Sequence, residues 1–244
     1  GYAIEARLYA ENPASNFLPT SGKVQKLKFP NISGLRIDSD LKNGDLVNIY
    51  FDPMLAKIIA HDISREKAIN KLKYALSKIV FLGPTTNIEL LKNILSSKSF
   101  VKGEYNTNFV FENNKMIQTD RDQSTIENVV IAATLFRSSK RNIKKRILKH
   151  LPSGWRNNFY SFQAEKFYFN GNYIECKYKI VNGIFIFSFN KSNYNVSIIR
   201  ARDNVLHAEI NGVLKKYHIK EIDKTIYIHS VDFGNVSMEV AERY

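Results

Sequence analysis

The chain has 244 residues, of which 44% are hydrophobic and 24% charged, and it contains 11 Gly and 6 Pro. This composition predicts one or two folded domains and excludes disordered, collagenous and low-complexity chains. The formal net charge of +13 would by itself suit a nucleic acid, an anionic membrane surface or an acidic protein as partner.

Targeting signals and disulfides are not visible in the sequence. The longest nearly unbroken apolar run, residues 129–136, is far shorter than the roughly 18 to 20 residues that span a membrane. No signal peptide precedes the patterned N-terminal segment, and the first residue is Gly rather than Met, so we expect a fragment or a processed chain. The single cysteine, Cys176, excludes an intrachain disulfide framework and favours the cytoplasm or an organelle matrix. We expect Cys176 to be a packed, unreactive thiol.

The first half of the chain reads as short strands followed by helices. Residues 2–9 and 23–29 alternate with the period of two that is typical of strands. Ser64 is a suitable N-cap for an amphipathic helix that should end before Gly83. A shorter helix is expected at about 86–95. Residues 113–123 are polar and without periodicity, and this pattern predicts a linker between two domains.

A long helix should follow the linker, from residue 125 to about 148. Ser124 and Glu127 have the spacing of a capping box at its start. Residues 126–136 are apolar on nearly every side of this helix, so they must be enclosed by other parts of the chain. Residues 137–149 are strongly basic and have no acidic neighbour in sequence; we interpret them as a solvated helix end or, alternatively, as a site for an anionic partner.

The rest of the chain predicts a β-barrel that could enclose this helix. Three Asn-Gly pairs, at 170–171, 182–183 and 211–212, are strong signals for tight hairpin turns. The strand-like segments lie at about 158–169, 173–181, 184–190, 195–201, 204–210, 213–220, 225–231 and 235–241. Eight consecutive antiparallel strands favour closure into an up-and-down barrel, because closure removes the exposed edges.

Common catalytic and ligand-binding signatures are missing from the sequence. It contains none of the motifs GxGxxG, GxxxxGK[ST], HExxH, GxSxG and CxxC. The five histidines do not have the spacing of metal ligands, so no metal site is predicted within this chain.

Four segments in chain order closely resemble the C-terminal subdomain of biotin carboxylase. They are GYAIEARLYAENPASNFLPTSGKV, GLRIDSDLKNGDLVNIYFDPMLAKIIA, LGPTTNIELL and EYNTNFV. Tyr2 stands where this family usually has His. In addition, LPSGWRN at 151–157, followed by the eight strand-like segments, resembles the domain that joins the biotin carboxylase and biotin carrier parts of acyl-CoA carboxylase α subunits. In that family the joining domain is a barrel around a helix.

The resemblance implies an ATP-dependent ligase. In the family, the intact α subunit uses ATP, bicarbonate and Mg²⁺ or Mn²⁺ to carboxylate biotin, and a carboxyltransferase β subunit passes the carboxyl group to an acyl-CoA. The ATP-grasp core precedes the segment that begins at Gly1, and a biotin carrier domain is expected downstream in the same chain. We therefore expect this chain alone to be inactive and to bind none of these cofactors.

The resemblance also implies roles for three residues. Arg7 matches the arginine that lies against the ureido oxygen of biotin and is the candidate catalytic residue, whereas a salt bridge to Glu5 is its plain structural alternative. Asp52 matches a supporting aspartate near that site, which could orient Arg7 or bridge to the N-terminal region expected before this segment. Arg36 matches a residue of the subunit contact in free-standing biotin carboxylases, a contact that need not form in α subunits.

We thus predict an α+β chain in two parts. Residues 1–115 should be a biotin carboxylase C-terminal subdomain, a mixed sheet with helices, and residues 116–244 a helix-plus-barrel domain that contacts the carboxyltransferase β subunit in a hetero-oligomer. Propionyl-CoA is favoured as the acyl substrate, with methylcrotonoyl-CoA second. Neither a nucleic acid nor a membrane is expected as partner; a basic protein that binds nucleic acid or an anionic surface is the alternative from another class, and a scaffold without catalysis is a third.

Overall fold

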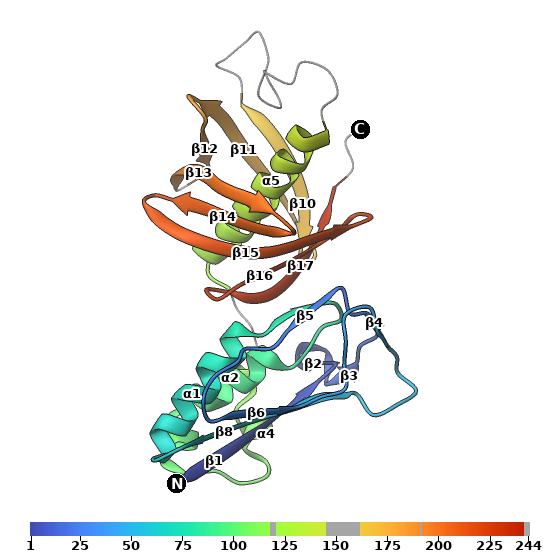
Figure 1. The fold of residues 1–244 in the computed structure, drawn as a ribbon, viewed down its shortest axis with the longest axis vertical. Helices are drawn as coiled ribbons and strands as arrows, with labels where there is room; N and C mark the ends of the chain where they lie inside the picture. The colour runs from blue at the N-terminus through green and yellow to red at the C-terminus, as the bar shows by residue number, and fades with distance from the viewer. Residues whose placement is uncertain (118–120, 145–161, 191, 242–244) are drawn as a thin grey trace. The chain divides into compact units, whose positions relative to one another are not determined.

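The computed structural model describes residues 1–117, 121–144, 162–190 and 192–241 of the chain (Figure 1). They belong to two compact units, Gly1–Asp120 and Arg121–Tyr244. No helix among the described residues is long and apolar enough to cross a membrane.

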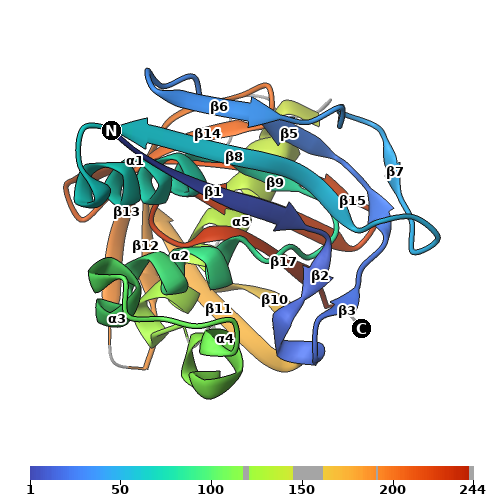
Figure 2. The same ribbon diagram turned by 90° about the horizontal axis from the view of Figure 1, so that it is seen from below.

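The first unit is built on a three-stranded sheet with the order β1-β8-β6 (Figure 2). These strands are Tyr2–Tyr9, Met54–Asp62 and Leu35–Asp38, and both pairings are antiparallel. Shorter antiparallel pairs surround it: β2 (Glu11–Asn12) with β3 (Leu18–Pro19), β4 (Gly22–Lys23) with β7 (Leu46–Val47), and β5 (Lys26–Lys28) with β9 (Val80–Leu82). The strand predicted at 23–29 is therefore divided between two partners, and the mixed sheet expected here is antiparallel in all its described pairs.

One face of the three-stranded sheet is covered by helices. Ser64 caps α1 (Arg65–Lys78) as predicted, its Oγ accepting from the Lys67 amide at 3.3 Å. The apolar face of α1 packs in one core with the inward side chains of β1 and β8. The other helical segments are η1 (Pro13–Ser15), α2 (Ile88–Ser96), α3 (Lys98–Lys102), α4 (Phe109–Glu112) and η2 (Asn114–Met116).

The second unit is a closed barrel of eight antiparallel strands, as the sequence predicted. The strands are β10 (Gln163–Phe169), β11 (Asn172–Val181), β12 (Ile184–Ser188), β13 (Asn193–Arg202), β14 (Val205–Ile210), β15 (Val213–Ile222), β16 (Thr225–Ser230) and β17 (Gly234–Val240). The predicted turn at 170–171 has φ of 49° and 77°, the two positive values that a type I′ turn needs. Asp203 and Asn204 (φ 53° and 60°) also have positive φ at a hairpin turn, without the Asn-Gly signal.

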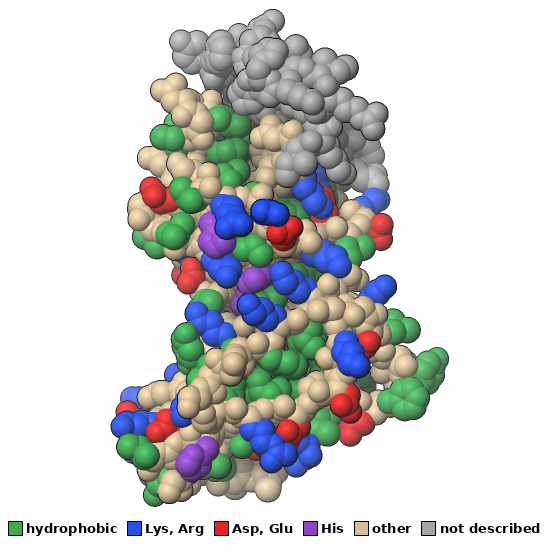
Figure 3. Space-filling view, viewed as in Figure 1, with side chains coloured by type: hydrophobic (Ala, Val, Ile, Leu, Met, Phe, Trp, Pro, Cys, Tyr) green, Lys and Arg blue, Asp and Glu red, His purple; other side chains and the backbone are tan. Residues whose placement is uncertain are grey.

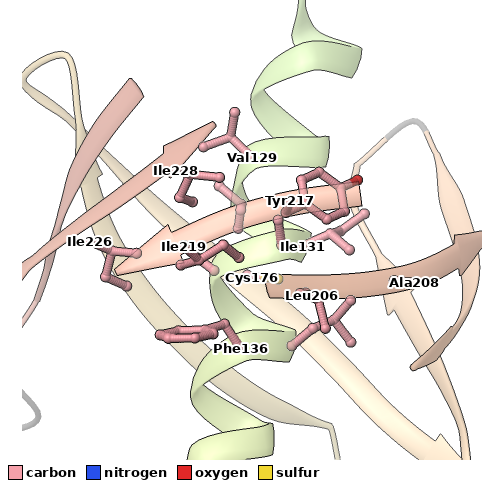
Figure 4. Packing of buried hydrophobic residues seen from close by; sticks show 14 of the residues in the cluster. Val129, Ile131, Phe136, Cys176, Leu206, Ala208, Tyr217, Ile219, Ile226 and Ile228 are labelled. Carbon is pink, nitrogen blue, oxygen red and sulfur yellow. The ribbon is translucent and has the colours of Figure 1, made fainter. Parts of the chain in front are cut away.

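Helix α5 (Gln123–Lys144) runs through the barrel (Figures 1 and 4). Every residue from Val129 to Leu135 has 0% exposure, so the helix is buried on all sides. Barrel side chains, including Tyr217, Ile219 and Ile228, point at it from the surrounding strands (Figure 4). The prediction that an apolar helix is enclosed by the barrel is confirmed.

The predicted capping box at the start of α5 is wrong. The helix begins at Gln123, and the Asp122 carboxylate accepts from the Thr125 amide at 3.0 Å. Glu127, which the pattern assigned to the cap, is buried and accepts from Ser192 Oγ at 2.5 Å and from Tyr194 Oη at 2.8 Å. Glu127 on α5 therefore binds side chains outside the helix, and the sequence pattern mistook it for a partner of Ser124 because the two residues are three positions apart.

The basic half of α5 is partly neutralised, contrary to the impression from the sequence. Arg141 Nη1 donates to Glu165 Oε1 at 2.6 Å, and Arg137 pairs with both Glu165 and Glu221. Lys140 Nζ lies 3.3 Å from Glu221 Oε2. The acidic partners come from β10 and β15, far away in sequence. The side chains from 143 to 149 lie outside the described residues. Figure 3 shows positive side chains spread over one face of the barrel, with acidic ones between them.

Cys176 lies in the core of the barrel, and burial raises the pKa of its thiol to about 12. A raised pKa leaves the thiol protonated at neutral pH, and the protonated form is a poor nucleophile. We expect iodoacetamide to leave the folded chain unmodified at pH 8 over the time in which it fully alkylates the chain in denaturant. Mass spectrometry would count the adducts. Rapid alkylation without denaturant would contradict the packing of Cys176.

Candidate functional site

The face of the β1-β8-β6 sheet that the helices do not cover carries two of the predicted site residues. Along β1, Ala6 and Leu8 point into the core, while Glu5 and Arg7 are exposed on the opposite face because side chains alternate. Figure 2 shows β1, β8 and β6 in front of the helices. The site is therefore an open sheet surface and not a closed pocket within this unit.

Arg7 is fixed by its neighbours along the same strand. Its Nε donates to Glu5 Oε1 at 2.8 Å. The salt bridge to Glu5, which the sequence suggested as the alternative to a catalytic role, is therefore present. Hydrogen bonds with Glu5 and Tyr9 raise the pKa of Arg7, which stays fully charged. The Arg7 side chain is nevertheless 57% exposed, and an exposed pair of this kind contributes little to stability. The guanidinium is thus both oriented and available to a ligand.

Arg36 lies on the same face, two strands away from Arg7. In the strand register Lys57 stands opposite both Arg7 and Asp38, so the three side chains form one row across the sheet. Arg36 Nε donates to Asp38 Oδ1 at 2.9 Å, and its side chain is 74% exposed. The outer face therefore carries two oriented arginines, each with a carboxylate two residues away on its own strand.

Asp52 precedes β8, near the end of the sheet where Tyr9 pairs with Met54. Its Oδ1 accepts from the Met54 amide at 2.9 Å, and the hydrogen bond of Arg7 described above goes to Glu5 instead. Burial, and then the charge of Asp52, raise the pKa of Glu11. Asp52 thus shapes the start of β8 and the charge near Glu11.

Sequence reasoning missed Asn87, which contacts the backbone of β1 on both sides of Leu8. Asn87 is 6% exposed and belongs to the LGPTTNIELL segment, to which no role was assigned. Its position before an apolar helical run is also that of an ordinary helix cap, so the sequence alone gave no sign of its use.

Two further features of the sequence analysis are the metal site that it did not predict and the LPSGWRN motif. Among the described residues, no three His, Cys, Asp or Glu side chains gather as a metal site. The LPSGWRN motif at 151–157 lies outside the described residues.

Comparison with known proteins supports the resemblance in the first unit. Residues 5–112 match the biotin carboxylase C-terminal domain family. The chain is 38% identical over 135 residues to the mitochondrial methylcrotonoyl-CoA carboxylase subunit alpha of Dictyostelium discoideum, covering 55% of this chain and 19% of that protein. It is 34% identical over 149 residues to the mitochondrial propionyl-CoA carboxylase alpha chain of Sus scrofa, covering 57% and 20%.

Among solved structures, the biotin carboxylase subunit of pyruvate carboxylase is 31% identical, with a TM-score of 0.48, over 50% of this chain and 27% of that one. The chain thus spans about a fifth of the length of the two curated relatives. Arg7 and Arg36, on the outer sheet face, lie within the segment, residues 5–112, that matches the biotin carboxylase C-terminal domain family.

Proposed function

We propose that this chain is part of the α subunit of a biotin-dependent acyl-CoA carboxylase, an ATP-dependent ligase. The observation that carries the proposal is Arg7, an oriented and accessible guanidinium on the outer sheet face of a biotin carboxylase C-terminal domain. The ATP, the Mg²⁺ or Mn²⁺ and the bicarbonate of the reaction are assigned to the part of the protein that precedes Gly1. We place the intact protein in the cytoplasm or the mitochondrial matrix.

The proposed chemistry of this chain is electrostatic. Biotin, when bound, supplies a ureido nitrogen that accepts the carboxyl group. Arg7 would hold the ureido oxygen of biotin as a hydrogen-bond donor, and a preorganised donor at that oxygen would stabilise negative charge on it. Arg7 fits this task because its guanidinium cannot deprotonate, and because Glu5 and Tyr9 hold its direction while it stays exposed.

For the second unit we propose docking on the carboxyltransferase β subunit. A closed barrel offers no free strand edge, so a partner must bind its side chains. Apolar side chains are exposed at two hairpin ends: Val181 and Ile184 at 41% each, and Val213 and Leu214 at 57% and 64%. Such residues suit the apolar centre of a protein interface. The ion pairs of Arg137 and Arg141 on α5 also leave less positive charge for a nucleic acid.

We favour propionyl-CoA as acyl substrate and keep methylcrotonoyl-CoA as the second choice. The preference comes from the LPSGWRN motif. In the proposed enzyme the CoA pocket belongs to the β subunit, so the described residues do not decide between the two.

Docking and non-specific charge binding can be separated by salt. We expect the 244-residue chain to capture the carboxyltransferase β subunit at fixed stoichiometry in physiological salt, because an apolar centre is not screened. Binding to a duplex oligonucleotide should be lost at that salt, since counterion release makes it fall log-linearly with salt concentration. Titration calorimetry would measure both. Tight oligonucleotide binding together with no capture of the β subunit would overturn the docking proposal.

A further inference from the structure

We propose that Asn87 is a positioning residue for Arg7. This inference rests on the proposed function of Arg7 and adds a residue from a separate element of the fold. The side chain of Asn87 binds the backbone of β1 at the two peptide groups that flank Leu8. Asn87 Nδ2 donates to the Arg7 carbonyl oxygen at 3.1 Å, and Asn87 Oδ1 accepts from the Tyr9 amide at 2.9 Å.

The side-chain amide of Asn87 makes hydrogen bonds to β1 like those that a neighbouring strand would make. Among the strands that the structure describes, β1 is an edge strand of its sheet, with β8 on one side only. Donating to one residue and accepting from the residue two positions later is what a neighbouring strand would do at this edge. The backbone amide of Asn87 adds a third contact, donating to the Tyr9 carbonyl at 3.2 Å. Asn87 therefore fixes β1 from the side opposite to β8.

The contact lies where the pairing with β8 is irregular. The register of β1 and β8 shifts between Leu8 and Tyr9, so that Leu8 faces Ala56 while Tyr9 faces Met54. Such a shift locally disrupts the ladder and re-aims side chains. At this point the direction of the Arg7 side chain depends on the other edge of β1, which Asn87 holds.

Helix capping does not account for the Asn87 side chain. Asn87 occupies the N-cap position of α2, and its carbonyl accepts from the Leu91 amide at 3.0 Å. Asn is favoured at this position because its side chain can bind the first free amides of the helix. Here the side chain makes no capping hydrogen bond to α2. Both of its polar groups are used on β1 instead.

The test is a double-mutant cycle in the intact α subunit. Asn87→Asp keeps an acceptor for the Tyr9 amide. It replaces the Nδ2 donor with a carboxylate oxygen, which cannot donate to the Arg7 carbonyl and is repelled by it. We expect the kcat for carboxylation of free biotin to fall about tenfold with an unchanged KM for ATP, because a small displacement of an oriented group costs rate. Arg7→Ala/Asn87→Asp should be no slower than Arg7→Ala alone, because both changes remove the same interaction.

Asn93→Asp is the matched control. Asn93 lies on α2, and its Nδ2 donates to the Met116 carbonyl at 2.9 Å, a similar side-chain-to-backbone tie away from β1. This variant should keep the wild-type kcat. If Asn87→Asp does not fold, Asn87→Ser, whose side chain is too short to bridge both groups, replaces it in the cycle.

The outcomes separate this inference from the proposed function. A wild-type rate for Asn87→Asp, or losses that multiply in the double variant, would overturn the role of Asn87 while the slow Arg7→Ala still supports the site. A wild-type rate for Arg7→Ala would instead reject the proposed function. The Nε–Hε NMR signal of Arg7 in the 244-residue chain gives a direct readout: it should shift in Asn87→Asp and stay in place in Asn93→Asp.

Discussion

Arg7→Ala is expected to lower the rate of biotin carboxylation by the intact α subunit about 10²-fold or more. Removing one preorganised donor at a developing oxyanion typically costs on the order of 10² to 10³ in kcat. The affinity for ATP should barely change, because ATP is assigned to the part of the protein before Gly1. The carboxylation of free biotin, followed through ADP release, measures both quantities.

Arg36→Ala provides the control for this experiment. Arg36 is exposed on the same sheet face and, like Arg7, donates to a carboxylate two residues away on its own strand. Because both ion pairs are exposed, neither substitution should unfold the domain. We expect Arg36→Ala to keep the wild-type rate. Unaltered carboxylation by Arg7→Ala would remove Arg7 from the chemistry.

Val130→Asp should destabilise the barrel by several kcal/mol. Val130 has 0% exposure in the middle of the enclosed helix, so the new carboxylate would be buried without a partner or would force the barrel open. The only cysteine of the chain, Cys176, belongs to the same core and reports on this unit alone. The measurement is therefore the urea concentration at which Cys176 becomes reactive. This concentration should be much lower for Val130→Asp than for the unaltered chain.

Asn142→Asp is the corresponding control on the same helix. Asn142 is exposed, and surface changes of this kind alter stability by about 0.5 kcal/mol or less. Its midpoint for Cys176 exposure should match that of the unaltered chain. If Val130→Asp also matched it, the helix could not be the core of the barrel.

The parts of the structure that depend on nearby residues were predictable from the sequence. The Asn-Gly turns, the cap at Ser64 and the all-round apolar stretch of α5 each contain their own signal, and together they indicated a barrel around a helix. The pattern failed where distant residues compete for one side chain. Glu127 looked like a capping partner for Ser124, yet it binds Ser192 and Tyr194 across the barrel.

The candidate site shows the same division. The family motifs identified Arg7, Arg36 and Asp52 as candidate site residues. The alternation of side chains along β1 places Arg7 on the exposed face of the sheet. Asn87 reaches Arg7 across 80 residues of sequence, and only the folded chain shows this contact. Without the fold, an Asn before an apolar helical run is an ordinary cap.

The topology of the barrel also leads us to expect an order of assembly. β10 and β17, the first and last strands, close the barrel through two register pairs, Phe167 with Val240 and Tyr168 with Glu239. These pairs join the most distant strands of the barrel, so their loop-closure entropy is the largest. Residues 129–135 of α5 have 0% exposure inside this closed barrel. We therefore expect α5 to be enclosed as the strands pair, and the β10–β17 seam to close late.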